Sequence, residues 1–248
     1  MLYLSGKKMV ALALLLGVLP LFAAGPQGNA DEKSAALAAK TMAAMGGAEN
    51  YNNTRFLSWN FFGSRQHYWD KWTGRVRIED LKNNMLVLMN VNTKEGEIFE
   101  NGEKVTDEAK QKEYLQKGYE WWINDSYWLV MPYKLRDPGV TLAYEGEGKT
   151  EAGQDADVIA MTFESVGVTP QNKYKVYIGK DDNLIRQWDF FPTADAAEPR
   201  FKTPWDDWAQ HGTIQLSGNR GKYSLADIKV HDQLADAVFT DPAPVQAM

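Results

Sequence analysis

The sequence predicts a mainly β protein: a large, curved antiparallel sheet, forming an incomplete β-barrel, covered by an N-terminal helix and a mid-chain helical lid. Two observations predict it. Most of the chain after residue 54 consists of short segments of strand character joined by tight turns, and sequential hairpins of this kind pair antiparallel. Helical spacing with capping residues occurs only at the start and in the middle. A curved sheet of about ten strands encloses more space than its side chains fill, so we expect a cavity beneath the helices.

Residues 1–30 are predicted to be a secretory signal peptide. Lys7 and Lys8 precede an apolar run over residues 9–24, which is short for a spanning helix, and small residues follow. Cleavage after Ala24 and cleavage after Ala30 both fit, and we prefer the second. An uncleaved membrane anchor is the alternative. The mature chain is then a single domain covering residues 31–248, and we expect it to be periplasmic or secreted from a bacterium.

The composition excludes several classes of protein. The formal charge is −6 and the basic residues are scattered, whereas nucleic-acid binding needs a clustered basic face. There is no cysteine, so the chain forms no disulfide and carries no lipidated N-terminal cysteine. After the signal, no segment is long and apolar enough to form a transmembrane segment.

Two helical regions are predicted. The first covers residues 31–48; Asp31 or Ser34 caps it, and the Gly46–Gly47 pair ends it. The second begins after Thr106 or Asp107 and continues into the aromatic segment 118–140. Because residues before a proline disfavour helical geometry, we expect that segment to form broken helices that end before Pro132.

The remaining segments have strand character. We expect strands within residues 55–63, 64–80 (two strands around a turn at 71–74), 85–91, 96–105, 140–147, 155–165, 172–179, 184–191, 211–218 and 224–231. Asn101–Gly102 is a hairpin-type turn, and residues 181–183 form another. Gly139 ends a turn that needs positive φ. Residues 192–204 are predicted to be a polar loop, and the tail from Phe239 is expected to fray.

The aromatic segment contains six Trp and Tyr residues, so it is either an unusual core element or the lining of a cleft for an apolar ligand. The chain has 9 Trp and 11 Tyr. This number favours a lining, because a plain core uses more Leu and Ile, which have no polar tip to satisfy. The predicted ligand-binding residues are Trp59, Phe61, Trp121, Trp122, Trp128 and Tyr133, together with Arg77, which would meet a polar head group or latch the lid.

The chain resembles the LolA/LolB-like superfamily, carrier proteins that sort lipoproteins to the bacterial outer membrane. The resemblance rests on the exported start, the first helix ending in Gly46–Gly47, the strands RFLSWNFFG and HYWDKWTGRVRIE, the inserted helix and the late hairpin VYIGKDDNLIRQWDF. More closely, HYWDKWTGRVRIE, NVNTKEGEIFENGEKV and DSYWLVMPYKLRDPGVTLAYEGE resemble an uncharacterised family of exported bacterial proteins.

The superfamily implies an incomplete β-barrel closed by helices, with an apolar cavity that holds acyl chains. It also implies that a strand arginine latches the lid. Arg65, Arg75 and Arg77 lie on the corresponding early strands, and the sequence leaves open which of them does so.

Catalytic and metal sites find little support in the sequence. On a strand, His67 and Asp70 point to opposite faces, which is poor geometry for an acid–base pair. Asp207 and His211 share a face only if their segment is helical, and a zinc site would need a third ligand. No nucleotide-binding or hydrolase motif occurs. We therefore expect a non-enzymatic protein without cofactor or metal.

Three functional hypotheses follow. The preferred one is a periplasmic binding or carrier protein for a lipid, a lipoprotein acyl chain or another amphiphile, held between the sheet and the lid. The alternative is a carbohydrate-binding protein or glycan-active enzyme that uses the same aromatic cleft; Asn124 and Asp125 supply polar partners there. The third is a subunit of an envelope complex, with an outer-membrane or envelope protein as its partner and the aromatic patch as the interface.

Overall fold

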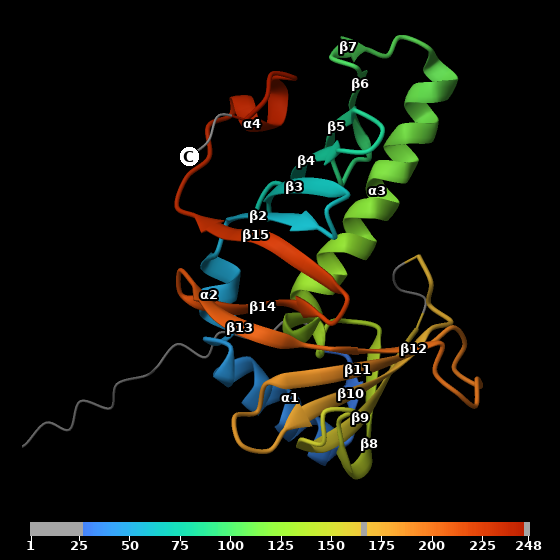
Figure 1. The fold of residues 1–248 in the computed structure, drawn as a ribbon, viewed down its shortest axis with the longest axis vertical. Helices are drawn as coiled ribbons and strands as arrows, with labels where there is room; N and C mark the ends of the chain where they lie inside the picture. The colour runs from blue at the N-terminus through green and yellow to red at the C-terminus, as the bar shows by residue number, and fades with distance from the viewer. Residues whose placement is uncertain (1–26, 165–167, 246–248) are drawn as a thin grey trace, which may run out of the picture.

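We describe the fold from a computed structural model that covers residues 27–164 and 168–245. Most of the predicted signal peptide, residues 1–26, lies outside the described residues. The chain is mainly β, with two antiparallel sheets that do not close into a barrel and a long mid-chain helix (Figure 1). The predicted fold class is confirmed, although the strands divide between two sheets where one was expected.

The larger sheet has nine strands, in the order β13-β14-β15-β2-β3-β4-β5-β6-β7. From β2 to β7 each strand pairs antiparallel with the next along the chain, as the predicted hairpins require. The strands are β2 (Phe56–Phe61), β3 (Arg65–Asp70), β4 (Arg75–Asp80), β5 (Met85–Asn90), β6 (Glu95–Glu100), β7 (Glu103–Lys104), β13 (Asp206–His211), β14 (Ile214–Arg220) and β15 (Tyr223–His231). Asn101 and Gly102 both adopt positive φ, which confirms the hairpin turn between β6 and β7.

The smaller sheet has six strands, in the order β1-β8-β9-β10-β11-β12. They are β1 (Asn29–Ala30), β8 (Val140–Lys149), β9 (Asp155–Phe163), β10 (Lys173–Gly179), β11 (Ile185–Phe191) and β12 (Phe201–Pro204). Only β1 pairs parallel, with β8, and it falls inside the predicted signal region. The prediction of a polar loop over residues 192–204 is wrong at its end, where β12 lies. The residues of β12 have a low apolar content, but they pair with β11.

The two sheets meet where the chain passes from β12 to β13. Trp205 separates these strands; its side chain is fully buried, and its backbone N–H donates to the carbonyl of Arg186 on β11. β13 then pairs with β14 of the other sheet, and Asp207 adopts positive φ. A bend of this kind transfers one edge segment to a second sheet, which is why a single continuous sheet does not form.

Three shorter helices cover the outside. α1 (Glu32–Ala44) is capped by Asp31, as predicted, and packs against β8. α2 (Ala48–Asn53) follows directly after Gly46–Gly47 and was missed. The tail forms α4 (Ala237–Thr240) on β4 and β5, where the guanidinium of Arg77 donates to the carbonyls of Asp241 and Ala243. The prediction that the tail frays is therefore wrong for the residues up to Ala243, which make these contacts.

The mid-chain helix is the longest element. α3 (Glu108–Val130) starts at the predicted cap, Asp107, and is continued by the 3₁₀ helix η1 (Met131–Lys134). The predicted break within the helix is wrong, because Gly118 is accommodated against the sheet and α3 is continuous, but α3 does end before Pro132, which lies in η1. α3 runs along β5 and β6 of the larger sheet and reaches β14 at its other end (Figure 1).

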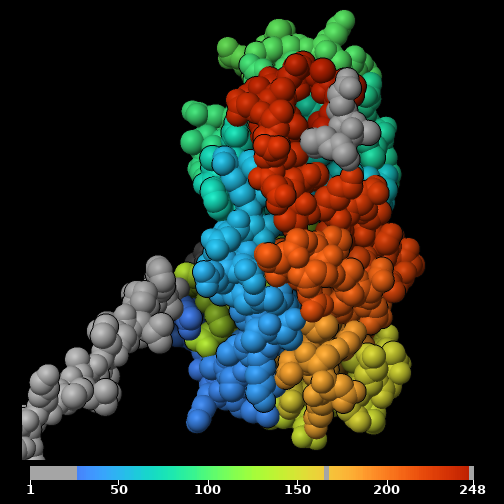
Figure 2. All heavy atoms as spheres, turned by 90° about the vertical axis from the view of Figure 1, so that its left-hand side faces the viewer, coloured from blue at the N-terminus to red at the C-terminus, as the bar shows by residue number. Residues whose placement is uncertain are grey.

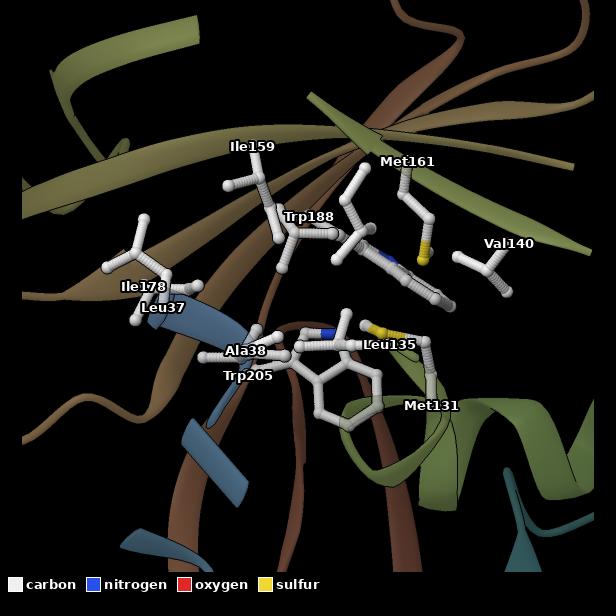
Figure 3. Close-up of a cluster of buried hydrophobic side chains, with 13 residues drawn as sticks. Leu37, Ala38, Met131, Leu135, Val140, Ile159, Met161, Ile178, Trp188 and Trp205 are labelled. Atoms are coloured by element: carbon white, nitrogen blue, oxygen red, sulfur yellow. The ribbon is translucent and has the colours of Figure 1, made fainter. Parts of the chain in front are cut away.

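Separate apolar cores lie at the two ends of the molecule. Val76, Ile78 and Val87 of the larger sheet pack against the first half of α3. At the other end Trp188 and Trp205 lie beside Met131, near the start of η1 (Figure 3). Among the helices of residues 27–164 and 168–245, α3 is thus the one with a face in both cores.

Replacing Gly118 by Leu is expected to lower the free energy of unfolding by about 2 kcal/mol. A Cβ at this position would lie 2.8 Å from Cγ1 of Val87 and 3.2 Å from the sulfur of Met89, so α3 would have to move away from β5. Lys112→Leu, at an exposed position of the same helix, is the matched control. Urea unfolding of both variants measures the effect, and equal stabilities would contradict a close helix–sheet contact at Gly118.

Candidate functional site

The position of α3 depends on one buried carboxylate. The Asp125 side chain is fully buried and accepts two hydrogen bonds from Arg65 of β3, at 2.6 Å from Nε and 2.9 Å from Nη2. His67 Nε2 lies 2.7 Å from the same carboxylate, and because a carboxylate only accepts, the imidazole proton is on Nε2. Burial raises the pKa of Asp125, but the hydrogen bonds from His67 and Arg65 outweigh burial, and the net shift is downward.

A second arginine holds the C-terminal end of α3. Arg220 of β14 is buried and donates to the carbonyl of Trp128 at 2.8 Å, which satisfies one of the helix's last carbonyls. Its guanidinium lies 3.6 Å from the ring centroid of Trp205. Burial lowers the pKa of Arg220 to about 9, so the group still carries its charge at neutral pH.

Between the C-terminal half of α3 and the smaller sheet lies a cleft of about 580 Å³. Nine aromatic side chains line it: Tyr119, Trp122, Tyr127 and Trp128 from α3, and Phe163, Tyr174, Trp188, Phe190 and Phe201 from β9 to β12. Lys134, Asp137, Pro138 and Val140 complete this part of the lining. Phe201 and Val168 are 37% and 45% exposed, so these two lining residues reach solvent.

The aromatic walls are packed against each other. Trp188 of β11 contacts Trp128 edge-on at 4.8 Å between ring centroids and stacks on Tyr174 at the same distance. Phe201 stacks on Phe190 at 4.9 Å and on Trp128 at 6.0 Å. These contacts fix the rings, so the walls of the cleft are largely preformed.

The cleft's polar groups are few, and most are already paired. Asn172 donates to the Thr169 hydroxyl at 2.8 Å, and Lys134 forms an ion pair with Asp137. Burial raises the pKa of Tyr127 far above its ordinary value and that of Tyr174 to about 12. Both phenols therefore stay neutral, and neither acts as an acid or base near neutral pH.

The structure brings two of the seven predicted ligand-binding residues, Trp122 and Trp128, to this cleft. Trp121 instead lies beside Arg65, with the guanidinium 5.3 Å from its ring. Trp59 is fully buried and stacks on His67 at 4.6 Å.

The other three lie elsewhere. Tyr133 is buried, stacks on Tyr51 and donates its hydroxyl hydrogen toward the backbone carbonyl of Met45 or Gln215. Phe61 lies at the end of β2 in the core that contains Trp59. Arg77 is on the opposite face of the sheet from α3, and it is Arg65 among the three early arginines that binds the mid-chain helix.

The weaker chemical candidates do not assemble into a catalytic or metal site. His67 bonds to Asp125, whereas Asp70 bonds to Arg55 on the opposite face of the sheet, as strand alternation predicts. The residues from Asp206 to His211 form strand β13, so the helical premise for Asp207 and His211 is wrong. Within residues 27–164 and 168–245, no group of three or more His, Asp or Glu residues is placed to hold a metal ion.

Sequence reasoning missed most of the sheet side of the cleft. Trp188 and Phe190 are two residues apart on β11 and therefore share a face, and Tyr174 is the direct partner of Phe190 on β10. This spacing was the available signal. Which face met α3 depended on the position of Asp125 and on the bend at Trp205, and neither follows from local pattern.

Comparisons with known proteins give little guidance. No protein-family model matches the chain, and no curated protein matches it. Among solved structures, the chain is similar to a DUF1329 family protein from Desulfovibrio piger, with a TM-score of 0.42 and 13% identity over 84% of this chain and 96% of that one. It is also similar to MucB, with a TM-score of 0.23 and 12% identity over 82% of this chain and 60% of that one. Similarity this low carries no functional inference.

No helix within the described residues is long and apolar enough to cross a membrane.

Asp125→Asn is expected to lower the free energy of unfolding at neutral pH by about 3 kcal/mol, because it leaves the Arg65 guanidinium without its buried carboxylate. Glu120→Gln, an exposed carboxylate on the same helix, is the control and should change stability by less than about 0.5 kcal/mol. Chemical denaturation of the three proteins makes the comparison.

The stability difference between wild type and Asp125→Asn should depend on pH if the charge of the carboxylate causes it. The folded pKa of Asp125 is below its unfolded value, so its contribution is complete above the unfolded pKa of about 3.9 and is lost as the pH falls through the folded pKa. The stability difference between wild type and Asp125→Asn should therefore shrink below about pH 4. A difference that stays constant to lower pH would show that packing, and not the carboxylate charge, is responsible.

Proposed function

We propose that this chain is an exported, non-enzymatic protein that binds or carries a lipid, a lipoprotein acyl chain or another amphiphile in the aromatic cleft. The observation that carries the proposal is an open cleft of about 580 Å³ lined by nine aromatic rings. Its volume is in the range of small-molecule sites, and burying apolar ligand surface against such walls is worth about 25 cal/mol per Å².

The distribution of polar groups suits an amphiphile. The charged pair Lys134 and Asp137 is part of the cleft lining, next to Pro138 in the chain, and a polar head group would meet it. The walls between α3 and β9–β12 are aromatic and would contact the apolar part. The sequence resemblance to the LolA/LolB-like superfamily implies an acyl-chain cavity and points the same way.

A sugar in this cleft is less well supported. A sugar ring presents several hydroxyls, and each needs a partner when it is buried. The amide groups of Asn124 and Asn172 and the hydroxyl of Ser126 already bond to neighbouring protein atoms. The cleft therefore offers apolar area but few unpaired polar side chains.

Trp122→Ala is expected to weaken binding of a fluorescent fatty acid such as cis-parinaric acid at least tenfold, which corresponds to about 1.4 kcal/mol. The matched control is Trp121→Ala: the residue is adjacent on the same helix but lies beside Arg65 and not in the cleft. Titration of wild type and both variants measures the effect. Native mass spectrometry of protein purified from its own envelope without detergent should also reveal a lipid-sized adduct.

Failure to bind the probe, with no adduct retained, would contradict the carrier proposal. Equal weakening by the two substitutions would show that the effect comes from general loosening of α3 and not from the cleft.

The contacts of residues 28–30 bear on the position of signal-peptide cleavage in the exported protein. Gly28 exchanges hydrogen bonds with Arg136 at 3.1 Å through its backbone N–H and carbonyl, and β1 pairs with Thr141 and Leu142 of β8. Cleavage after Ala24 keeps these contacts, whereas cleavage after Ala30 removes them. The contacts therefore favour cleavage after Ala24 over cleavage after Ala30, the site preferred from the sequence.

The intact mass of the secreted protein is expected to correspond to a first residue of Gly25. A mass that begins at Asp31 would show that β1 is dispensable, and an unprocessed mass would favour a membrane anchor.

A further inference from the structure

A second cleft, of about 710 Å³, lies on another face of the molecule. Its walls come from α2, the turn between β3 and β4, the turn between β13 and β14, and the segment that follows β15. Figure 2 shows this face, where the blue segment of α2, the orange β13–β14 turn and the red C-terminal segment meet. Its lining is mostly polar, in contrast to the aromatic cleft.

Trp72 is the most exposed large apolar side chain in the part of the chain that the structure describes, at 60%. This exposed residue is held in place by two hydrogen bonds. Its Nε1 donates to the carbonyl of Asn52 at 3.0 Å, and its backbone N–H donates to Asp70 at 3.2 Å. The ring is therefore a rigid, solvent-facing platform at the edge of the cleft.

Asp70 fixes the surroundings of this platform. Its buried carboxylate accepts two hydrogen bonds from Arg55, at 3.0 and 2.9 Å, and one from Arg75 at 3.2 Å. Arg55 in turn lies 5.2 Å from the Trp72 ring centroid, and Arg75 also pairs with Asp236. Both cations of the cleft are thus neutralised by carboxylates, so a free anion gains little there.

Several neutral or acidic side chains of this cleft are available to bond to a ligand. The side chains of Asn53, Thr213, Asp232 and Gln233 line the cleft, are exposed, and make no hydrogen bond or ion pair with any described residue. Amides both donate and accept, a hydroxyl does the same, and a carboxylate accepts. These are the groups that match the hydroxyls of a sugar, whose apolar ring face stacks on an aromatic platform.

We propose that this polar cleft binds a neutral oligosaccharide, with Trp72 stacking on one sugar ring and Asn53, Asp232 and Gln233 bonding to its hydroxyls. This site is separate from the aromatic cleft, since the two share no lining residue. The inference does not depend on the proposed lipid-binding function.

The test is calorimetric titration of the full mature protein with three neutral probes: maltohexaose, cellohexaose and chitohexaose. At least one is expected to bind with a Kd below about 1 mM, or −4 kcal/mol. Trp72→Ala should weaken that binding at least tenfold, and Gln233→Ala at least threefold. Both residues are exposed, so neither substitution is expected to unfold the protein.

Trp122→Ala, in the aromatic cleft, is the matched control and should leave saccharide affinity within twofold. Binding lost in Trp122→Ala but kept in Trp72→Ala would place the sugar in the other cleft and overturn the proposal. Absence of binding by all three probes at about 10 mM would overturn it as well. Tighter binding of a sulfated oligosaccharide would contradict the assignment of a neutral ligand.

Discussion

The arrangement of this protein depends on the hydrogen bonds that the buried carboxylate of Asp125 accepts from Arg65 and His67. α3 carries aromatic residues around much of its circumference, so burial of apolar area alone does not decide which of them faces the sheet. A charged group in the interior is costly unless its partners are in place, and Arg65 and His67 supply them from adjacent inward positions of one strand. The ion pair therefore sets the rotation of the helix more sharply than the aromatics do.

Once that rotation is fixed, neighbouring residues have different environments. Successive residues of an α-helix point about 100° apart, so Trp121 lies over Arg65 while Trp122 reaches Trp69 and the cleft. Farther along the helix, Trp128 extends to the smaller sheet and contacts Trp188. One helix thus closes the core of the larger sheet and forms a wall of the cleft against the smaller one. α3 is an anchored wall more than a free lid, because Arg220 also donates a hydrogen bond to the carbonyl of Trp128 near the C-terminal end of the helix.

Local pattern was enough to predict most elements, and it failed where distant contacts decide. The hairpins from Phe56 to Lys104 follow from alternation and from turns such as Asn101–Gly102. β1 was missed because two residues carry no periodicity, and its pairing with β8 is a long-range contact. The bend at Trp205 was missed for a similar reason: it depends on a backbone bond to Arg186 that no spacing encodes. The same limit applies to the cleft, where the helical wall was predicted in part and the sheet wall was not.

The high number of Trp residues is only indirect evidence for a binding surface, because some of them lie in the core. Trp59 and Trp205 are fully buried, and neither indole N–H has an acceptor among the described residues, a loss of about 1–3 kcal/mol each. The indole N–H groups of Trp122 and Trp188 are also buried and unpaired, although the rings of both residues line the cleft. Trp72 is the opposite case, because its N–H is paired while its ring is exposed. The residue type therefore does not identify a binding surface: Trp59 and Trp205 fill the core, Trp122 and Trp188 line the aromatic cleft, and among these residues only Trp72 combines a paired N–H with a largely exposed ring.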